Sequence, residues 1–411
     1  MTRSPLRWVV AVAASFAIAQ AYACGSKDDD ANVTPDTSDG GIGAQTPATP
    51  ATGNPDARDA GAPAAPQGPS GPPQVQFIGR FDTTDPAGPK ATWPGSRIVT
   101  RFSGTAVSVK LSEVAEDWMD GAPSYWDISI DHAAPKVIGM TADSQPHVFE
   151  LAKDLPAGDH EVELYKRSEM QTGTTQFLGF DFHGGRALPP PARAKRHFEA
   201  MADSYGTGYG IVDLNAPNLV CTPGPDHAGR HQNFRQAWPS LLAARFDAEM
   251  EGTVYSGKGL TRGIWPTDDD GLIDYYNRSN PNPAMAHNPP LFDLESWVPD
   301  AIVLVQGTVD NGLGDFRGVY RDFVVNQLRA RAPNAHIFLV VPGRIAREKW
   351  IDTVNSVAAE RVAAGDSKVY PIIPGEEQPE EMTGCGYHGS PVYHQRIANE
   401  IGAVVAAKTG W

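Results

Sequence analysis

The residues whose types and spacing are best suited to chemistry surround Ser204. A short run typical of a β-strand precedes this serine, and Gly206, Gly208 and Gly210 follow it at alternate positions. Glycine adopts backbone angles that a Cβ forbids, so the chain can turn sharply here and leave backbone amides beside the hydroxyl. A serine hydroxyl needs a base to remove its proton and donors to hold an oxyanion. We therefore predict that Ser204 is a nucleophile; the alternative is a serine that caps a helix in a glycine-rich turn.

The candidate base lies close to the C-terminus, in the segment 384–394. This segment contains two histidines, His388 and His394, and we predict that His388 accepts the proton of Ser204. The alternative is a hydrogen-bonded loop histidine without a catalytic role.

The sequence after the proline-rich stretch 187–192 has the pattern of an α/β fold. Short apolar runs alternate with longer stretches of helical periodicity, among them 315–332, which indicates parallel strands joined by helices. Functional residues of such sheets gather beyond the carboxyl ends of the strands, and Ser204, Gly257 and Gly307 each follow a predicted strand. The predicted strands are 197–202, 253–255, 301–305, 337–341 and 368–372.

Residues 75–182 have a different pattern, in which apolar and polar residues alternate in short runs. Val107, Val109 and Leu111 are expected to face a core while Ser108 and Lys110 face solvent. This pattern predicts an antiparallel β-sandwich. Its predicted strands are 97–102, 106–111, 125–130, 147–151, 161–165 and 176–182.

Residues 1–24 have the features of a secretory signal peptide. Two arginines precede the mostly apolar run 8–19, and Ala21-Tyr-Ala23 forms a small-x-small cleavage signal. The run is too short to span a bilayer comfortably, which makes a retained transmembrane helix the weaker interpretation. Cys24 follows the cleavage signal directly and resembles the cysteine of a bacterial lipobox. Two alternatives stay open: lipid attachment at Cys24, which would anchor the protein to the cell envelope, and plain secretion.

The predicted division of the chain is a signal peptide at 1–24, a disordered linker at 25–73, a β-sandwich domain at 74–190 and an α/β domain at 191–411. The linker contains almost no large apolar residue and cannot offset its chain entropy by burial. The formal net charge of −15 disfavours nucleic acid as a partner, because phosphate binding needs clustered Lys and Arg.

Two cysteines, Cys221 and Cys385, remain when Cys24 is set aside. Export permits a disulfide, which would tie the loop after Ser204 to the loop that carries His388. The alternative is a pair of buried thiols, since sequence alone does not determine connectivity.

With these motifs in order, the chain resembles the bacterial acetyl esterases of carbohydrate esterase family 2, within the SGNH (GDSL-like) hydrolase superfamily. In the first domain the order of the blocks carries the resemblance rather than any single one. The blocks of the first domain are 78–82, 93–96, 102–105, 130–131, 166–169 and 177–180. Those of the second domain are 202–210, 256–260, 307–310 and the His388 region through Ala398.

The resemblance implies an SGNH-type three-layer α/β/α domain with a parallel sheet, preceded by a jelly-roll β-sandwich. It implies that Ser204 attacks an acetyl ester of a carbohydrate and that His388 accepts the serine proton and then protonates the departing sugar oxygen. The backbone amides of Ser204 and Gly257 would form the oxyanion hole, Tyr387 would stack on the substrate, and neither metal nor cofactor is required.

Some positions near the site depart from the family pattern. Val309 stands where the family has an asparagine that donates to the oxyanion, and Asn311 is the nearby residue that could replace it. Gly386 and Cys385 occupy the positions of the acid that usually orients the histidine, so we expect a Ser–His dyad in which a backbone carbonyl holds the imidazole.

His227 and His231 have a spacing that could bind a metal. Neighbouring proline and glycine residues indicate a loop, and no carboxylate motif accompanies them, so we expect surface histidines.

Three functions remain for comparison. The first is an exported carbohydrate O-acetyl esterase. The second is a carbohydrate-binding protein that kept the fold and lost turnover, which Val309 and the missing acid favour. The third is an α/β-hydrolase, because Ala202-x-Ser-x-Gly206 resembles a nucleophile elbow. This third function is the weakest, because the serine follows the first strand of its domain and leaves no room for the earlier strands that the α/β-hydrolase fold requires.

Overall fold

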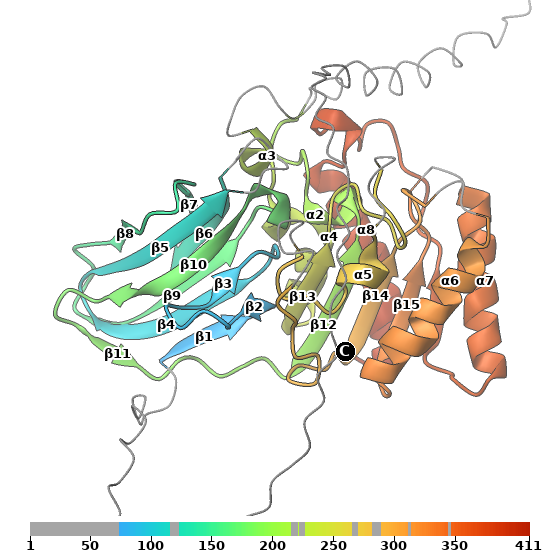
Figure 1. Ribbon diagram of the computed structural model, residues 1–411, viewed down its shortest axis with the longest axis horizontal. Helices are drawn as coiled ribbons and strands as arrows, with labels where there is room; N and C mark the ends of the chain where they lie inside the picture. The colour runs from blue at the N-terminus through green and yellow to red at the C-terminus, as the bar shows by residue number, and fades with distance from the viewer. Residues whose placement is uncertain are drawn as a thin grey trace, which may run out of the picture. The chain divides into compact units, whose positions relative to one another are not determined.

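The computed structural model (Figure 1) describes residues 74–115, 123–214, 221, 227–264, 270–281, 289–310, 314–343 and 347–411. The predicted signal peptide, the linker, Cys24 and Asn311 lie outside these residues. From residue 74 onwards the described residues fall within one compact unit. The proposed boundary between residues 190 and 191 stays a prediction. Among the helices in the described part of the chain, none combines the length and the apolar character needed to cross a membrane.

Two antiparallel sheets form the first half of the fold (Figure 1). All six predicted strands are present, and shorter strands extend both sheets. The first sheet runs β1 (Val75–Ile78), β4 (Arg97–Gly104), β9 (Gly158–Lys166), β6 (Tyr125–Ile130) and β7 (Lys136–Gly139), with β11 (Arg186–Leu188) beside β4. The second runs β2 (Phe81–Asp82), β3 (Lys90–Ala91), β10 (Gly173–Asp181), β5 (Val107–Ala115) and β8 (His147–Ala152).

The period-two pattern explains how the two sheets pack. Val107, Val109 and Leu111 of β5 are buried and share a core with Trp126 of β6 in the facing sheet, whereas Lys110 is exposed. The expectation that Ser108 faces solvent is wrong, because its hydroxyl lies 2.8 Å from His183 Nε2 and the residue is buried. Alternate residues of a strand face opposite sides, so one side becomes core and the other meets solvent. The result is a β-sandwich; its assignment to the jelly-roll class stays a prediction.

A parallel sheet forms the second half of the fold, and each predicted strand has a counterpart in it, although the strand predicted at 253–255 is Ala248–Val254 and begins five residues earlier. Their order is β13 (Ala248–Val254), β12 (Arg196–Ala202), β14 (Ala301–Val305), β15 (His336–Val340) and β16 (Val369–Ile372). The first strand in the sequence, β12, therefore lies between the second and the third. In such sheets a ligand-binding crevice forms where the strand order reverses, beyond the carboxyl ends.

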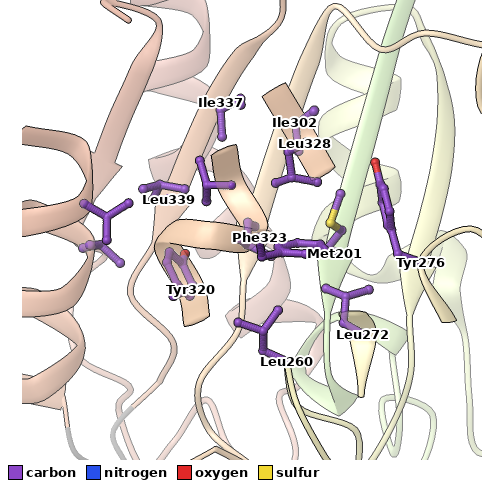
Figure 2. Packing of buried hydrophobic residues seen from close by; sticks show 14 of the residues in the cluster. Met201, Leu260, Leu272, Tyr276, Ile302, Tyr320, Phe323, Leu328, Ile337 and Leu339 are labelled. Atoms are coloured by element: carbon purple, nitrogen blue, oxygen red, sulfur yellow. The ribbon is translucent and has the colours of Figure 1, made fainter. Parts of the chain in front are cut away.

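Helices cover both faces of this sheet (Figure 1). Ala301 and Val303 pack with α4 (Trp238–Arg245) and α8 (Pro391–Thr409) on one face. The other face packs on α6 (Phe316–Phe323), its π-helical continuation η6 (Val324–Arg329) and α7 (Arg347–Ala363). Figure 2 shows Met201, Ile302 and Leu339 beside Phe323 and Leu328 in this second core. The predicted helix 315–332 is thus present, and the layers are α/β/α.

Short elements complete the fold: η3 (Met170–Thr172), α2 (Ser204–Thr207), α3 (His227–Arg230), η4 (Phe234–Gln236), α5 (Leu272–Tyr275) and η7 (Cys385–Tyr387).

A buried ionic network joins the sandwich to the parallel sheet. Glu199 of β12 and Glu251 of β13 are direct neighbours in the strand register and are 0% and 1% exposed. Arg80 of the sandwich lies 2.7 Å from the Glu199 carboxylate and 3.0 Å from that of Glu251. Arg331 lies 2.8 and 3.1 Å from the same two carboxylates. Burial raises the pKa of Glu251, and the two arginines oppose that shift. The two arginines thus compensate two adjacent buried negative charges.

We expect Arg80→Met to lower the free energy of unfolding by about 3–5 kcal/mol, because it leaves two adjacent buried carboxylates with Arg331 as their one remaining arginine partner among the described residues. Urea unfolding followed by circular dichroism measures the change. The matched control is Arg101→Met, which removes an exposed pair with Asp159 at 3.9 Å and should change stability by about 0.5 kcal/mol or less. Equal effects of the two substitutions would contradict a supporting role for Arg80.

Candidate active site

Ser204 is the first residue of the short helix α2, immediately beyond the carboxyl end of β12. Asp203 caps this helix, because its carboxylate accepts a 3.0 Å hydrogen bond from the Tyr205 N–H. A Cβ on Gly206 would lie 2.4 Å from the Cβ of Ala202, and Gly208 has φ of 73° where the helix ends. These two positions therefore require glycine. The close turn leaves Ser204 partly exposed at the end of the sheet.

Two buried carboxylates brace the turns around Ser204. Burial raises the pKa of Asp203 to about 6, with hydrogen bonds from Tyr205 and Thr308 opposing the shift. Asp310, which follows β14, accepts hydrogen bonds from the Leu260 N–H at 2.7 Å and the Thr261 N–H at 3.1 Å. Both carboxylates hold backbone, which agrees with a structural role.

The loop after β13 presents Gly257, with φ of 76°, close to α2. The Thr207 and Ser256 hydroxyl oxygens lie 3.1 Å apart and join this loop to α2. Gly257 accepts a 2.9 Å hydrogen bond from the Ile264 N–H, but its own N–H has no acceptor among the described residues. The Ser204 N–H begins a helix, where backbone donors have no intrahelical partner. The two amides predicted for an oxyanion hole are thus available as donors.

His388 follows the turn η7 and precedes α8. Its loop is attached to the loop after Ser204, because the Cys385 N–H donates to the Asp213 carbonyl at 3.1 Å and a disulfide joins Cys385 to Cys221. A Cβ on Gly210 would lie 2.5 Å from the Cys385 carbonyl oxygen, so glycine allows the two segments to approach closely. The predicted pairing of Cys221 with Cys385 is therefore present in the structure.

Two tyrosines from the serine block hold the His388 ring. Its ring centroid lies 5.6 Å from that of Tyr205 and 4.7 Å from that of Tyr209. Burial lowers the pKa of His388 to about 4, and the backbone of Gly386 and Cys385 opposes that shift. Nδ1 forms no hydrogen bond of good geometry among the described residues, so these backbone contacts are weak. No carboxylate contributes to the pKa shift, in agreement with the absence of an acid from the motif.

The remaining residues named from the sequence differ in their surroundings. Tyr387, beside the histidine, is 47% exposed. Val309 is partly buried and has no side-chain donor, and Asn311 lies outside the described residues. His394 is buried within α8, where its Nδ1 accepts a hydrogen bond from the Trp238 N–H at 3.3 Å, so this nitrogen is already engaged.

The expectation that His231 lies at the surface is wrong. His231 is 3% exposed and forms an ion pair with Asp213, which the local glycine and proline pattern did not indicate. These two side chains and the Cys385 sulfur lie within 4.8 Å of one another. Cys385 is in a disulfide, however, and metal binding to cysteine needs a thiolate. The oxidised group does not fit a metal. The side chain of His227 lies outside the described residues.

Sequence reasoning assigned no role to several residues that contact this site. Tyr205 and Tyr209 belong to the same block as Ser204, and their spacing on either side of the glycines is a signal that could have indicated them. Glu169 and Gln171 of the sandwich contact Ser256, and no local pattern indicates such a contact between distant segments.

Comparison with known proteins identifies relatives of this chain. Residues 77–191 match the family model described as carbohydrate esterase 2 N-terminal. The chain is 29% identical over 356 residues to the cellulase/esterase CelE of Acetivibrio thermocellus, covering 82% of this chain but 40% of CelE. It is 26% identical over 305 residues to an acetylxylan esterase/glucomannan deacetylase of Cellvibrio japonicus, covering 72% of this chain and 79% of that one.

The fold agrees with these sequence relationships. A family two carbohydrate esterase from Clostridium thermocellum, solved in complex with cellohexaose, aligns with a TM-score of 0.73 and 26% identity. The alignment covers 82% of this chain and 99% of the other. The predicted resemblance is thereby confirmed: by sequence and by fold, this chain is a relative of the family 2 carbohydrate esterases.

Proposed function

We propose that this protein is an exported carbohydrate O-acetyl esterase that uses Ser204 as nucleophile and His388 as general base. The observation that carries the proposal is the placement of Ser204 where the strand order of the parallel sheet reverses. Two backbone amides are available as donors there, and the loop that carries His388 is attached to the segment that follows Ser204. The esterase names of the relatives support the same class of reaction.

The proposed reaction has two steps. The Ser204 oxygen bonds to the acetyl carbon while His388 takes the serine proton, and the amides of Ser204 and Gly257 hold the resulting oxyanion. The carbon–oxygen bond to the sugar then breaks, and the proton passes from His388 to the departing sugar hydroxyl. In the second step His388 deprotonates water, which attacks the acetyl-serine. The bond between the acetyl carbon and the Ser204 oxygen then breaks, His388 returns the proton to that oxygen, and the acetyl group leaves as acetic acid.

His388 is unprotonated at neutral pH, as a general base must be, and it has no acidic partner in the described part of the chain. With the pKa lowered to about 4, the imidazole is neutral at neutral pH and its unprotonated nitrogen can accept a proton. Packing between Tyr205 and Tyr209 holds the ring plane, which is the positioning that an aspartate otherwise provides.

Acetylated polysaccharides or oligosaccharides are the substrate class that this proposal assigns. The names of the relatives mention acetylxylan and glucomannan, and one relative was solved with cellohexaose. Tyr387 offers a partly exposed aromatic face beside His388 on which a sugar ring could stack. The signal-peptide pattern supports export, with lipid attachment at Cys24 or plain secretion as the two alternatives.

A carbohydrate-binding protein with little turnover is the second candidate. Val309 supplies no side-chain donor to an oxyanion, and loss of one such donor costs about two to three orders of magnitude in rate. His388 also has no carboxylate partner contributing to its pKa. Retention on insoluble glycan without acetate release would favour this candidate.

The decisive variants are Ser204→Ala and His388→Ala. We expect each to lower kcat/KM for p-nitrophenyl acetate by at least about a hundredfold, since they remove the nucleophile and its base. Ser367→Ala and His132→Ala are the matched controls and should keep the rate of the unsubstituted protein, because both residues are exposed, Ser367 precedes the amino end of β16, and His132 belongs to the sandwich. If the unsubstituted protein is no faster than Ser204→Ala, the esterase proposal fails and binding becomes the leading function.

The pH dependence tests the base separately. A protonated imidazole cannot accept the serine proton, so activity should rise with pH through the pKa of His388. Because burial lowers that pKa, we expect the acid limb of kcat/KM below pH 6.5 and toward about 4. Circular dichroism at each pH must show a folded protein. An acid limb at pH 6.5 or above would contradict a lowered pKa for His388.

A further inference from the structure

The peptide group that precedes Gly257 is held by the β-sandwich. The Gln171 side-chain amide donates a 2.6 Å hydrogen bond to the Ser256 carbonyl, and the Glu169 carboxylate accepts a 2.9 Å hydrogen bond from the Ser256 N–H. Glu169, Gln171 and Ser256 are all buried. The N–H and the carbonyl of Ser256 are therefore both hydrogen-bonded to side chains at η3, which belongs to the sandwich and not to the α/β half of the fold.

The bond from Gln171 controls the direction of the neighbouring amide. The Ser256 carbonyl and the Gly257 N–H belong to one planar peptide group, which is trans. In a trans peptide the carbonyl and the N–H point in opposite directions. When Gln171 fixes the carbonyl on one side, the Gly257 N–H must point to the other. Gly257 has φ of 76° and lacks a Cβ, so its own backbone offers little resistance to a peptide rotation.

The turn that carries Gln171 is itself firmly held. The Glu169 N–H donates to the Gln232 side-chain oxygen at 2.7 Å, and the Gln232 amide donates to the Glu169 carboxylate at 2.6 Å. The Thr172 hydroxyl closes the turn with a 2.8 Å bond to the Glu169 carbonyl. Gln171 is thus presented from a rigid support.

The contacts of Gln171 are poorly explained by stability alone. Its amide oxygen is buried and has no partner among the described residues, which is unfavourable for a folded protein. An apolar side chain of similar length would remove that unpaired oxygen together with the donated bond. The side chain therefore matters for the orientation of a peptide more than for the strength of the interface.

We propose that Gln171 is a positioning residue for catalysis, which orients the Gly257 N–H toward the oxyanion across the Ser256–Gly257 peptide. This inference rests on the proposed esterase function and extends the active site into the β-sandwich. The side chain does not touch substrate; it acts through the peptide that it holds.

The test compares Gln171→Met with Tyr165→Phe. Gln171→Met keeps the length of the side chain and removes the donor. Tyr165→Phe removes another buried hydrogen bond between the sandwich and the α/β half, which joins the hydroxyl groups of Tyr165 and Ser240 of α4. We expect Gln171→Met to lower kcat for p-nitrophenyl acetate by about ten- to a hundredfold with KM changed less than about threefold, because an oxyanion donor acts in the transition state. Tyr165→Phe should keep kcat within about twofold, and the shift in Tm of Gln171→Met should not exceed that of Tyr165→Phe.

Two further measurements separate the outcomes. A crystal structure of Gln171→Met should show the Ser256–Gly257 peptide rotated or in more than one orientation; an unchanged peptide overturns the proposal even if the protein is less stable. If Ser204→Ala is inactive while Gln171→Met keeps kcat, this inference alone fails. If Ser204→Ala is as active as the unsubstituted protein, no oxyanion forms at this site, and the inference fails together with the proposed function.

Discussion

Two carboxylates on adjacent strands set the main constraint on this fold. Glu199 and Glu251 are neighbours in the register of β12 and β13 and are fully desolvated. Two such charges repel each other and are stable only when compensated. Arg331 compensates them from within the α/β half, and Arg80 does so from the sandwich. The strands that lead to Ser204 and Gly257 therefore depend on a residue of the other half of the fold.

The sandwich thus supports the parallel sheet at two levels. Arg80 forms ion pairs with carboxylates of β12 and β13. Glu169 and Gln171 hold the Ser256 backbone, which lies beyond the carboxyl end of β13. These contacts are buried and bonded on both sides, which makes relative movement of the two halves costly. A sandwich that holds the Ser256 backbone has a structural reason to stay attached to the parallel sheet.

The histidine loop follows a different principle. A backbone hydrogen bond and the Cys221–Cys385 disulfide attach it to the segment after Ser204, and the rings of Tyr205 and Tyr209 lie beside the His388 ring. Burial keeps the imidazole of His388 neutral, so the proposed mechanism needs no carboxylate to make it a base. The same burial makes the imidazolium less favourable once it forms, and the weak backbone contacts of Nδ1 are what oppose that effect.

The amino-acid sequence by itself determined the secondary-structure elements and indicated the residues able to take part in chemistry. Period-two runs such as 125–130 and apolar runs such as 301–305 became strands with those bounds, because local periodicity decides which faces can be buried. Ser204, Gly257 and His388 were indicated by residue type within glycine-rich blocks. Only the tertiary structure decided what surrounds them: the burial of His231 against Asp213, the packing of Tyr209 on His388, and the bond from Gln171 to Ser256. Those contacts join segments brought together by the packing of sheets and loops, and no local pattern in either segment specifies its partner.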